Sequence, residues 1–409
     1  MLSYQIKDKD TILPPVQVNL EIPIYKIKNV QEIKQTLNTA KDQLESIFAN
    51  PKTRSIWSDL DPFKAERNVV AQLGNTENVS NAWLKAYELI SYYELIPKKI
   101  SNEIGFLHFD NAAFPGSFIL ACHHYAHTIS QQLERTQQHN TKEINYNWKA
   151  SSLIMQTNED KEPLEDKYKL WANYRGHWLM SETNNGDVLD EKNQLDFAEK
   201  LQRKVDLYTS DLGFDVSSDY ANQELLHSVT NIGQIISGLL TLKTGGHFVT
   251  KQYTIFEPIS ISVIYAVASF FEEFYIAKPA TSRAANSEIY LVGKGFNGLA
   301  TKDHPYVRAM FDIIAKYKKE KVYQPMFHIK NCPTKFVEYI IKDVAVVLAE
   351  RQIKQIKYQL ELVDKVQKGK LTIRQYLESI EDELEKWFYD NPIQRINSNT
   401  KLKMKKAYS

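Results

Sequence analysis

Short apolar runs and longer stretches of helical spacing follow one another in the middle of the chain. Val205 to Thr209 is a mostly apolar run of strand length, which predicts a buried strand. Tyr220 to Leu242 repeats apolar residues at helical spacing, and Gly245-Gly246 after it predicts the end of that helix. Another short run, which closes at Lys251, predicts the next strand. This part of the sequence therefore predicts a strand, a helix and a second strand in succession.

Polar residues lie at the ends of both of these strands. Asp211 comes just after the first strand, and Lys251 ends the second. Open α/β sheets bind their ligands at the carboxyl ends of parallel strands. We therefore expect an acid and a lysine side by side at the ligand-binding edge of a sheet.

Two further stretches extend this alternation of strands and helices. Ile104 to Phe109 predicts a strand, and Pro115-Gly116 in the turn after it opens a helix from Phe118 to Ser130. A turn of small residues lets the backbone approach a cofactor closely. Downstream, two predicted strands surround a loop rich in Pro, Ser and Arg, and Glu288 starts the second of them. Ile144 to Trp148 predicts one more strand.

The two ends of the chain have helical patterns. After an extended segment bracketed by prolines, apolar residues from Val30 to Ile47 recur at steps of three and four, which predicts an amphipathic helix that ends at Pro51. This helix either docks on the rest of the chain or binds a partner helix. Near the other end, an apolar stripe from Ile353 to Val363 has lysines on its other side, among them Lys354 and Lys357. These lysines form either a solvated face or a track for an RNA backbone.

The composition predicts a globular protein with a large core and disfavours a membrane protein. A chain of 409 residues with 43% hydrophobic content buries a large core, so we expect one large domain with extensions, or two domains. No run of about eighteen apolar residues occurs, and the start of the chain lacks the apolar core of a signal peptide. We therefore expect a soluble intracellular protein that does not enter a membrane. The two cysteines are too few for a disulfide framework or a zinc ribbon, and we expect no metal site.

The charges are nearly balanced. The 51 basic and 50 acidic residues leave a net charge of +1, so any RNA site must be a local patch. One basic patch is the end of the chain, Arg395 to Ser409, which has five basic residues and no acid. We expect this tail either to bind RNA nonspecifically or to aid solubility.

From about Ala82 to Phe296, roughly half of the chain, the sequence resembles the FtsJ-like RNA ribose 2′-O-methyltransferases that use S-adenosylmethionine. It is most similar to their cap-specific branch in large DNA viruses. The resemblance rests on four motifs in the family's order, AWLKAYELI, TSDLG, FVTKQY and NSEIYLV. They supply a Lys-Asp-Lys-Glu set, here called the tetrad: Lys85, Asp211, Lys251 and Glu288. The resemblance implies that the tetrad is the catalytic site of such an enzyme.

The resemblance also implies a loop that binds S-adenosylmethionine. Here the loop runs from Asp110 through Pro115, Gly116 and Ser117 to Phe118, with the family's spacing from the acid to Pro-Gly. Ser117 stands where the family usually has a second glycine. Its hydroxyl either bonds the carboxylate of the cofactor or caps the following helix.

Two more acids are implied in cofactor binding. Asp187 lies in a Gly-Asp element, for which the family implies a hydrogen bond to the adenine amino group. Asp211 is implied to favour the positive sulfonium. No carboxylate follows the strand that ends at Trp148, so the contact to the cofactor ribose stays unassigned.

Methylation of a ribose hydroxyl requires a base, because the hydroxyl must lose its proton as the new bond forms. A free lysine side chain has a pKa of roughly 10.4, so a lysine can be this base only beside another cation and with burial. By resemblance, Lys251 is the base and Lys85 supplies the second positive charge. Asp211 and Glu288 then orient the two ammonium groups.

The expected function is therefore methylation of an RNA ribose 2′-hydroxyl, with the nucleotide beside an mRNA cap as its target. The expected partners are RNA, in particular capped mRNA, and other capping components. The expected location is the cytoplasm, or the virion for a viral protein. Two alternatives stay open: an internal ribosomal or transfer RNA 2′-O-methyltransferase, and a catalytically silent RNA-binding subunit with the same fold. No G-x-G-x-x-G follows the first strand, which disfavours a nicotinamide oxidoreductase.

The expected fold is α/β, with a Rossmann-like, twisted and mostly parallel sheet and helices on both of its faces. We expect three parts: an N-terminal helical extension over residues 1–80, a methyltransferase domain over residues 81–300, and a C-terminal helical extension with the basic tail over residues 301–409.

Overall fold

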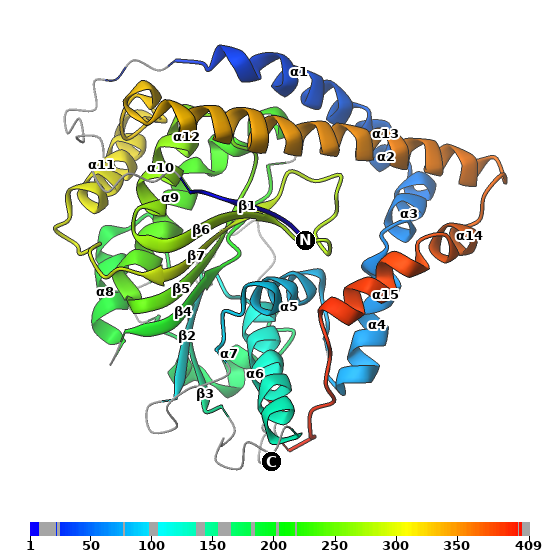
Figure 1. The fold of residues 1–409 in the computed structure, drawn as a ribbon, viewed down its shortest axis with the longest axis horizontal. Coiled ribbons are helices and arrows are strands. Elements are labelled where there is room, and N and C mark those ends of the chain that lie inside the picture. Colours follow the sequence, from blue (N-terminus) through cyan, green and yellow to red (C-terminus); the bar gives the residue numbers. More distant parts are fainter. Residues whose placement is uncertain are drawn as a thin grey trace.

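Seven strands form one sheet in the order β1-β6-β7-β5-β4-β2-β3 in the computed structural model (Figure 1). The structure describes residues 1–7, 22, 25–76, 78–97, 105–135, 144–153, 165–180, 185–201, 204–216, 219–399 and 401–402. The strands are β1 Leu2–Gln5, β2 Phe106–Asn111, β3 Tyr146–Ser151, β4 Val205–Ser210, β5 Leu242–Gln252, β6 Phe271–Lys278 and β7 Ile289–Phe296. The extended segment expected around Pro14 and most of the basic tail lie outside the described residues.

The sheet is mixed. Strands β3, β2, β4 and β5 are parallel, as predicted. Strands β7, β6 and β1 continue the sheet in antiparallel pairs. The α/β sheet is therefore confirmed, and its parallel part is the half that carries β2 and β4. Strand β1 is not predicted by the sequence pattern, because four half-buried residues are too few to show a period of two.

Helices cover both faces of the sheet. On one face, α5 Asn81–Tyr93 and α6 Ser117–Arg135 share a hydrophobic core with inward residues such as Leu207 and Val249. On the other face, α9 Gln223–Thr241 and α10 Pro258–Ala268 pack with the alternate residues Tyr208 and Phe248. This alternation follows from the period of two along a strand.

The structure corrects one helix boundary. Helix α9 ends at Thr241 and β5 begins at Leu242, so Gly245-Gly246 does not end the helix as predicted. The register between β4 and β5 shifts from Val205 opposite Leu242 to Leu207 opposite His247. The two glycines therefore form a bulge within a long strand, where Gly245 has a φ of +78°.

The remaining helices lie mostly in the flanks of the chain. They are α1 Lys28–Asp42, α2 Leu44–Ala49, α3 Pro51–Asp59, α4 Phe63–Gly74, α7 Leu170–Asn173, α8 Glu191–Lys200, α11 Pro305–Glu320, α12 Thr334–Glu338, α13 Val347–Gln367, α14 Ile373–Glu378 and α15 Glu381–Asp390, with short 3₁₀ turns at Arg175–His177, Tyr220–Asn222 and Ile329–Asn331 and a π-helical turn at Tyr339–Val346. The predicted N-terminal helix is divided into α1 and α2, and α1 lies along α13 (Figure 1). No helix among the described residues is long and apolar enough to span a membrane. The domain limits near residues 80 and 300 stay a prediction.

Candidate active site

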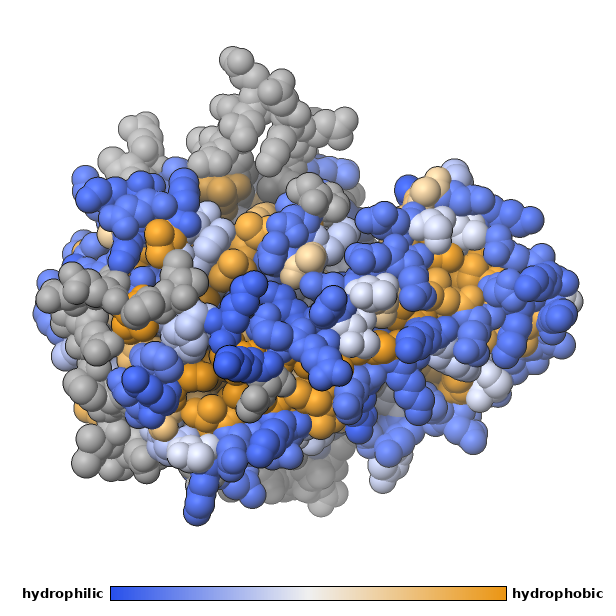
Figure 2. Space-filling model, turned by 90° about the horizontal axis from the view of Figure 1, so that it is seen from above, coloured by the Kyte–Doolittle hydropathy of each residue, from blue (hydrophilic) through white to orange (hydrophobic). Residues whose placement is uncertain are grey.

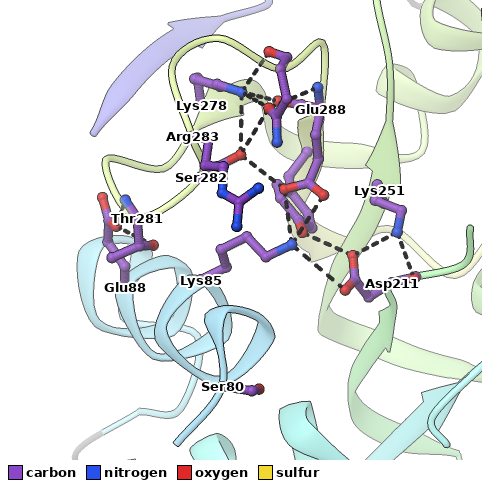
Figure 3. Close-up of polar contacts among 12 residues, drawn as sticks. Ser80, Lys85, Glu88, Asp211, Lys251, Lys278, Thr281, Ser282, Arg283 and Glu288 are labelled. Carbon is purple, nitrogen blue, oxygen red and sulfur yellow. Dashed lines mark hydrogen bonds and ion pairs between the residues drawn. The ribbon is translucent and has the colours of Figure 1, made fainter. Parts of the chain in front are cut away.

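Four separate elements bring the tetrad together at the carboxyl edge of the parallel strands (Figure 3). Lys85 lies on α5, Asp211 follows β4, Lys251 is near the end of β5, and Glu288 precedes β7. All four side chains are largely buried, with 10 to 19% of each side chain exposed.

The tetrad forms a row of alternating charges. The Lys251 Nζ lies 3.2 Å from the Asp211 Oδ1 and donates a hydrogen bond of 2.9 Å to the Asp211 carbonyl oxygen. The other oxygen of this carboxylate lies 3.8 Å from the Lys85 Nζ. Lys85 also donates to both oxygens of Glu288, at 2.9 and 3.0 Å. Each ammonium group therefore has a carboxylate partner, and Asp211 lies between the two lysines.

Burial and charge act in opposite directions on Glu288. Burial raises the pKa of a carboxyl group, because the charged form loses its hydration. The neighbouring ammonium groups, that of Lys85 first, outweigh burial and lower the pKa of Glu288 to about 2. Glu288 is therefore ionised at neutral pH.

Tyr290 also contacts the tetrad, although the sequence motifs did not indicate it. Its hydroxyl donates a hydrogen bond of 2.8 Å to the Asp211 Oδ1, and its ring lies 5.8 Å from the Lys85 Nζ. Burial and the nearby carboxylates raise the pKa of Tyr290 well above its usual value, so the hydroxyl keeps its proton and remains a donor. Tyr290 lies two residues after Glu288, and the strand period of two would have placed both on one face.

The loop between β6 and β7, residues 279–288, is held from within by Lys278. The buried Lys278 Nζ donates to the carbonyl oxygen of Glu288 at 2.7 Å, to that of Asn286 at 3.0 Å and to the Ser282 Oγ at 3.2 Å. Ser282 in turn donates to the Glu288 Oε1 at 2.9 Å. Burial lowers the pKa of Lys278 to about 7. Lys278 and Ser282 therefore fix the position of the Glu288 carboxylate.

Glu88 ties the same loop to α5, about one helical turn after Lys85. Its carboxylate accepts hydrogen bonds from the backbone N–H groups of Ala280 at 2.8 Å and Thr281 at 3.0 Å. It also accepts from the Thr281 hydroxyl at 2.8 Å and from the Trp387 Nε1 at 3.2 Å. This carboxylate sets the distance between the helix that carries Lys85 and the loop that carries Glu288 (Figure 3).

The predicted cofactor loop lies between β2 and α6, next to the tetrad. Gly116 has a φ of +114°, and a side chain there would meet Leu170, so the backbone requires glycine at this position. The Ser117 hydroxyl bonds the Ser80 Oγ at 2.9 Å and the Tyr168 hydroxyl at 3.1 Å. The Ser80 hydroxyl also caps α5 by accepting from the backbone N–H of Trp83.

Two other residues of this loop face the protein interior. The side chain of Phe118 is buried, and its ring centroid lies 6.4 Å from that of Tyr290. Asp110 is 2% exposed and accepts a hydrogen bond of 2.6 Å from the Thr209 hydroxyl. Burial, with a smaller effect of Asp211, raises the pKa of Asp110 well above its usual value. Pro115 is half-buried in the turn before Gly116.

Asp187 lies in the loop before α8, at the same edge of the sheet. A side chain at Gly186 would meet the carbonyl group of Ser152, so the loop packs against the end of β3. The Asp187 Oδ1 accepts a hydrogen bond of 2.9 Å from the backbone N–H of Leu189, which is the turn expected of an Asn-Gly-Asp sequence. The predicted roles of Asp187 and of the loop from Asp110 to Phe118 stay predictions.

Comparison with known proteins places the chain in a family. A family model described as "FtsJ-like methyltransferase" matches residues 78–296. Over 273 residues the chain is 35% identical to the "Probable methyltransferase EP424R" of African swine fever virus, isolate Pig/Kenya/KEN-50/1950, and the match covers 63% of this chain and 60% of that protein.

Two animal proteins are also similar. The chain is 31% identical over 290 residues to the "Cap-specific mRNA (nucleoside-2'-O-)-methyltransferase 2" of Danio rerio. This match covers 68% of this chain and 36% of that protein. The protein of the same name from Drosophila melanogaster is 28% identical over 324 residues, with 78% of this chain and 43% of that protein covered. The chain thus spans 60% of the length of the viral relative and less than half of the animal ones. From the match over residues 78–296, the chain belongs to the FtsJ-like methyltransferase family.

Proposed function

We propose that this protein transfers a methyl group from S-adenosylmethionine to a ribose 2′-hydroxyl of RNA, at the nucleotide beside the cap of an mRNA. The observation that carries the proposal is the meeting of Lys85, Asp211, Lys251 and Glu288 in one buried row of alternating charges. The names of the two animal relatives support the cap-adjacent target. Other capping proteins as partners, and a cytoplasmic location, belong to the same proposal.

The residues at the carboxyl edge suit S-adenosylmethionine. This cofactor presents a positive sulfonium and several N–H donors, which need acceptors and negative charge. Asp187 and Asp211 supply carboxylates there, and the backbone at Gly116 is free of a side chain. Asp187 would hold the adenine amino group, Gly116 would lie along the cofactor, and Asp211 would face the sulfonium. When bound, the cofactor supplies the electrophilic methyl group.

The tetrad would remove the proton of the ribose 2′-hydroxyl. The ribose hydroxyl attacks while Lys251, in its neutral form, accepts the hydroxyl proton at Nζ. Lys85 contacts two carboxylates, those of Glu288 and Asp211. Among the described ion pairs, Lys251 has one carboxylate within 4 Å of its Nζ, that of Asp211. Gly213 keeps the approach to Lys251 open, because a Cβ at this position would lie 2.7 Å from the Nζ. Asp211 holds both lysines in place and orients Lys251 toward the substrate.

One assay tests the reaction and its target. The protein is given labelled S-adenosylmethionine with capped and uncapped copies of one short RNA, and the methylated nucleotide is mapped by nuclease digestion. We expect label in the capped RNA alone, on the 2′-oxygen of the first transcribed nucleotide. Label at internal positions of both RNAs would instead indicate an internal 2′-O-methyltransferase. No label in any RNA would contradict the proposed activity.

A further inference from the structure

A cavity of about 670 Å³ lies between the loop 279–288 and helix α13. Its floor comes from the ends of the antiparallel strands, with Leu2, Lys278 and Ile289. Its loop wall includes Asn286 and Ser287, which directly precede Glu288. The cavity therefore shares one short loop with the tetrad but contains none of the four tetrad side chains.

The lining of this cavity is basic. It includes Lys278, Arg351 and Lys354, and it has no aspartate or glutamate. The Lys278 Nζ is already bonded to oxygens of the loop, and burial lowers its pKa to about 7, so the positive charge of the lining comes mainly from the other two side chains. Arg351 and Lys354 are exposed and form no ion pair with any residue that the structure describes. A concave surface with unpaired cations and no acids attracts an anion.

One face of α13 supplies three kinds of contact. Arg351, Lys354, Gln355 and Tyr358 follow one another at helical spacing, so they lie on one face of the helix and line the cavity together. Tyr358 is an exposed aromatic residue, with 43% of its surface accessible. The apolar stripe of α13, which includes Ile356, turns to the core instead. The cavity wall thus combines cations, an amide and an exposed aromatic ring.

We propose that this cavity binds a nucleoside polyphosphate, the group found at the 5′ end of the RNA substrate. Arg351 and Lys354 hold the phosphates, and the base lies against Tyr358, as bases stack on aromatic side chains in RNA-binding proteins. A volume of about 670 Å³ lies within the range of about 300–1,000 Å³ typical of ligand sites. A single inorganic phosphate would leave most of this space empty.

The position of the cavity connects it to the proposed reaction, on which this inference rests. Lys278 lines the cavity and also donates to the carbonyl oxygen of Glu288 at 2.7 Å. A 5′ end held at the cavity thus lies next to the tetrad, where the ribose of a neighbouring nucleotide would react. Helix α13 lies beyond the region that matches the family model, residues 78–296. The C-terminal extension therefore contributes to the choice of substrate.

Calorimetric titration with GTP as the probe tests the site without any catalysis. The double variant Arg351→Ala, Lys354→Ala removes the two unpaired cations from the exposed helix face. The matched control is Lys357→Ala, an exposed lysine of the same helix that does not line the cavity. We expect GTP to bind the wild type and the control equally and the double variant at least about tenfold more weakly. Equal affinities in the double variant and the control would overturn the proposal.

A second comparison tests the nucleoside part of the ligand. Tyr358→Leu keeps an apolar side chain but removes the ring, and Tyr358→Phe restores it. We expect weaker GTP binding in the leucine variant, recovery in the phenylalanine variant, and little effect of either change on inorganic triphosphate. Triphosphate that binds the wild type as tightly as GTP would contradict a role for the base.

RNA substrates separate this inference from the proposed function. We expect the double variant to raise the Michaelis constant for capped RNA and to weaken binding of the same RNA with a 5′-triphosphate, but not binding of the same RNA with a 5′-hydroxyl. Binding of S-adenosylhomocysteine should be unchanged. If the double variant methylates the capped RNA and binds all three RNAs as the wild type does, the cavity is not the 5′-end site, although the methyltransferase function stands. If GTP binding depends on Arg351 while the wild type methylates no RNA, the cavity site stands and the proposed function fails.

Discussion

Two regions on either side of the loop 279–288 use basic residues in opposite ways. On the side of α5, Lys85 and Lys251 are largely buried, and each is paired with a carboxylate. On the side of α13, Arg351 and Lys354 are exposed and line a cavity without acids. Pairing holds a side chain at a fixed position, as proton transfer requires, whereas an unpaired cation keeps its charge available for a ligand.

The surface on the side of α1 and α13 can be seen in Figure 2. It is mostly hydrophilic, and apolar residues are visible between the hydrophilic ones (Figure 2). Lys278 lies between the two regions, since it lines the cavity and also supports Glu288. Substitutions on each side should therefore have separable effects, and substitution of Lys278 should affect both.

The largest effect is expected from Lys251→Arg. A guanidinium keeps the positive charge but cannot give up a proton in a protein, so it cannot act as the base. We expect the turnover rate to fall by about 10²- to 10⁴-fold, with little change in the Michaelis constant for RNA. Steady-state kinetics measures both values. GTP binding at the cavity should not change, and retention of more than about a tenth of the wild-type rate would show that Lys251 is not the base.

Lys278→Met should change how stability depends on pH. The pKa of Lys278 in the folded protein is about 7, against an ordinary value of 10.5. Between these values the unfolded chain keeps a proton that the folded protein has released. This residue therefore makes stability rise with pH across that window, by at most about 1.4 kcal/mol per pH unit.

Denaturant unfolding at a series of pH values above about 7 measures this contribution. We expect the stability of the wild type relative to Lys278→Met to increase as the pH rises. Lys357→Met on the exposed face of α13 is the control, and its profile should run parallel to that of the wild type. Parallel profiles for all three proteins would mean that Lys278 is not deprotonated in the folded state.

Tyr290→Phe should have a moderate effect on the α5 side alone. The change removes the hydroxyl that donates to Asp211 at 2.8 Å and leaves the ring in the core. Loss of one such hydrogen bond costs about 0.5–1.5 kcal/mol, so we expect turnover to fall by about two- to tenfold. Tyr389→Phe, at a residue that is 86% exposed, is the control. Unchanged turnover in Tyr290→Phe would mean that Lys85 and Lys251 alone position Asp211.

The smallest effect is expected at Asp187, away from both regions. Asp187→Asn keeps an oxygen for the backbone N–H of Leu189 but replaces the other acceptor oxygen with an amino group. We expect about threefold weaker binding of S-adenosylhomocysteine in calorimetry for both Asp187→Asn and Asp187→Ala. Weaker binding in the alanine variant alone would assign Asp187 to the turn and not to the cofactor.

The sequence alone predicts the positions of some of the tetrad residues and not of others. Strand periodicity placed Asp211 and Lys251 at one edge of the sheet, and both lie there. Periodicity could not place Lys85, because its partner Glu288 is 203 residues away along the chain. Only the order of the four motifs, recognised through the family resemblance, joined them.

Other features had no usable signal in the sequence. The cavity depends on how α13 packs against the loop 279–288, where the Gln352 Nε2 donates to the Ala285 carbonyl oxygen at 2.9 Å. Such a contact between distant segments leaves no periodic pattern. The helix end predicted at Gly245-Gly246 was wrong because glycine pairs occur both at helix ends and in strand bulges.

The hydrogen bonds of Glu88 have a consequence for local unfolding. One buried carboxylate joins α5, the backbone at Ala280 and Thr281, and Trp387 of α15. If α15 detaches, the carboxylate loses a donor and the loop loses part of its anchor. Amide hydrogens of α15 and of the loop should therefore exchange with solvent as one cooperative unit. Protection of the loop 279–288 against exchange would then depend on a helix about a hundred residues further along the chain.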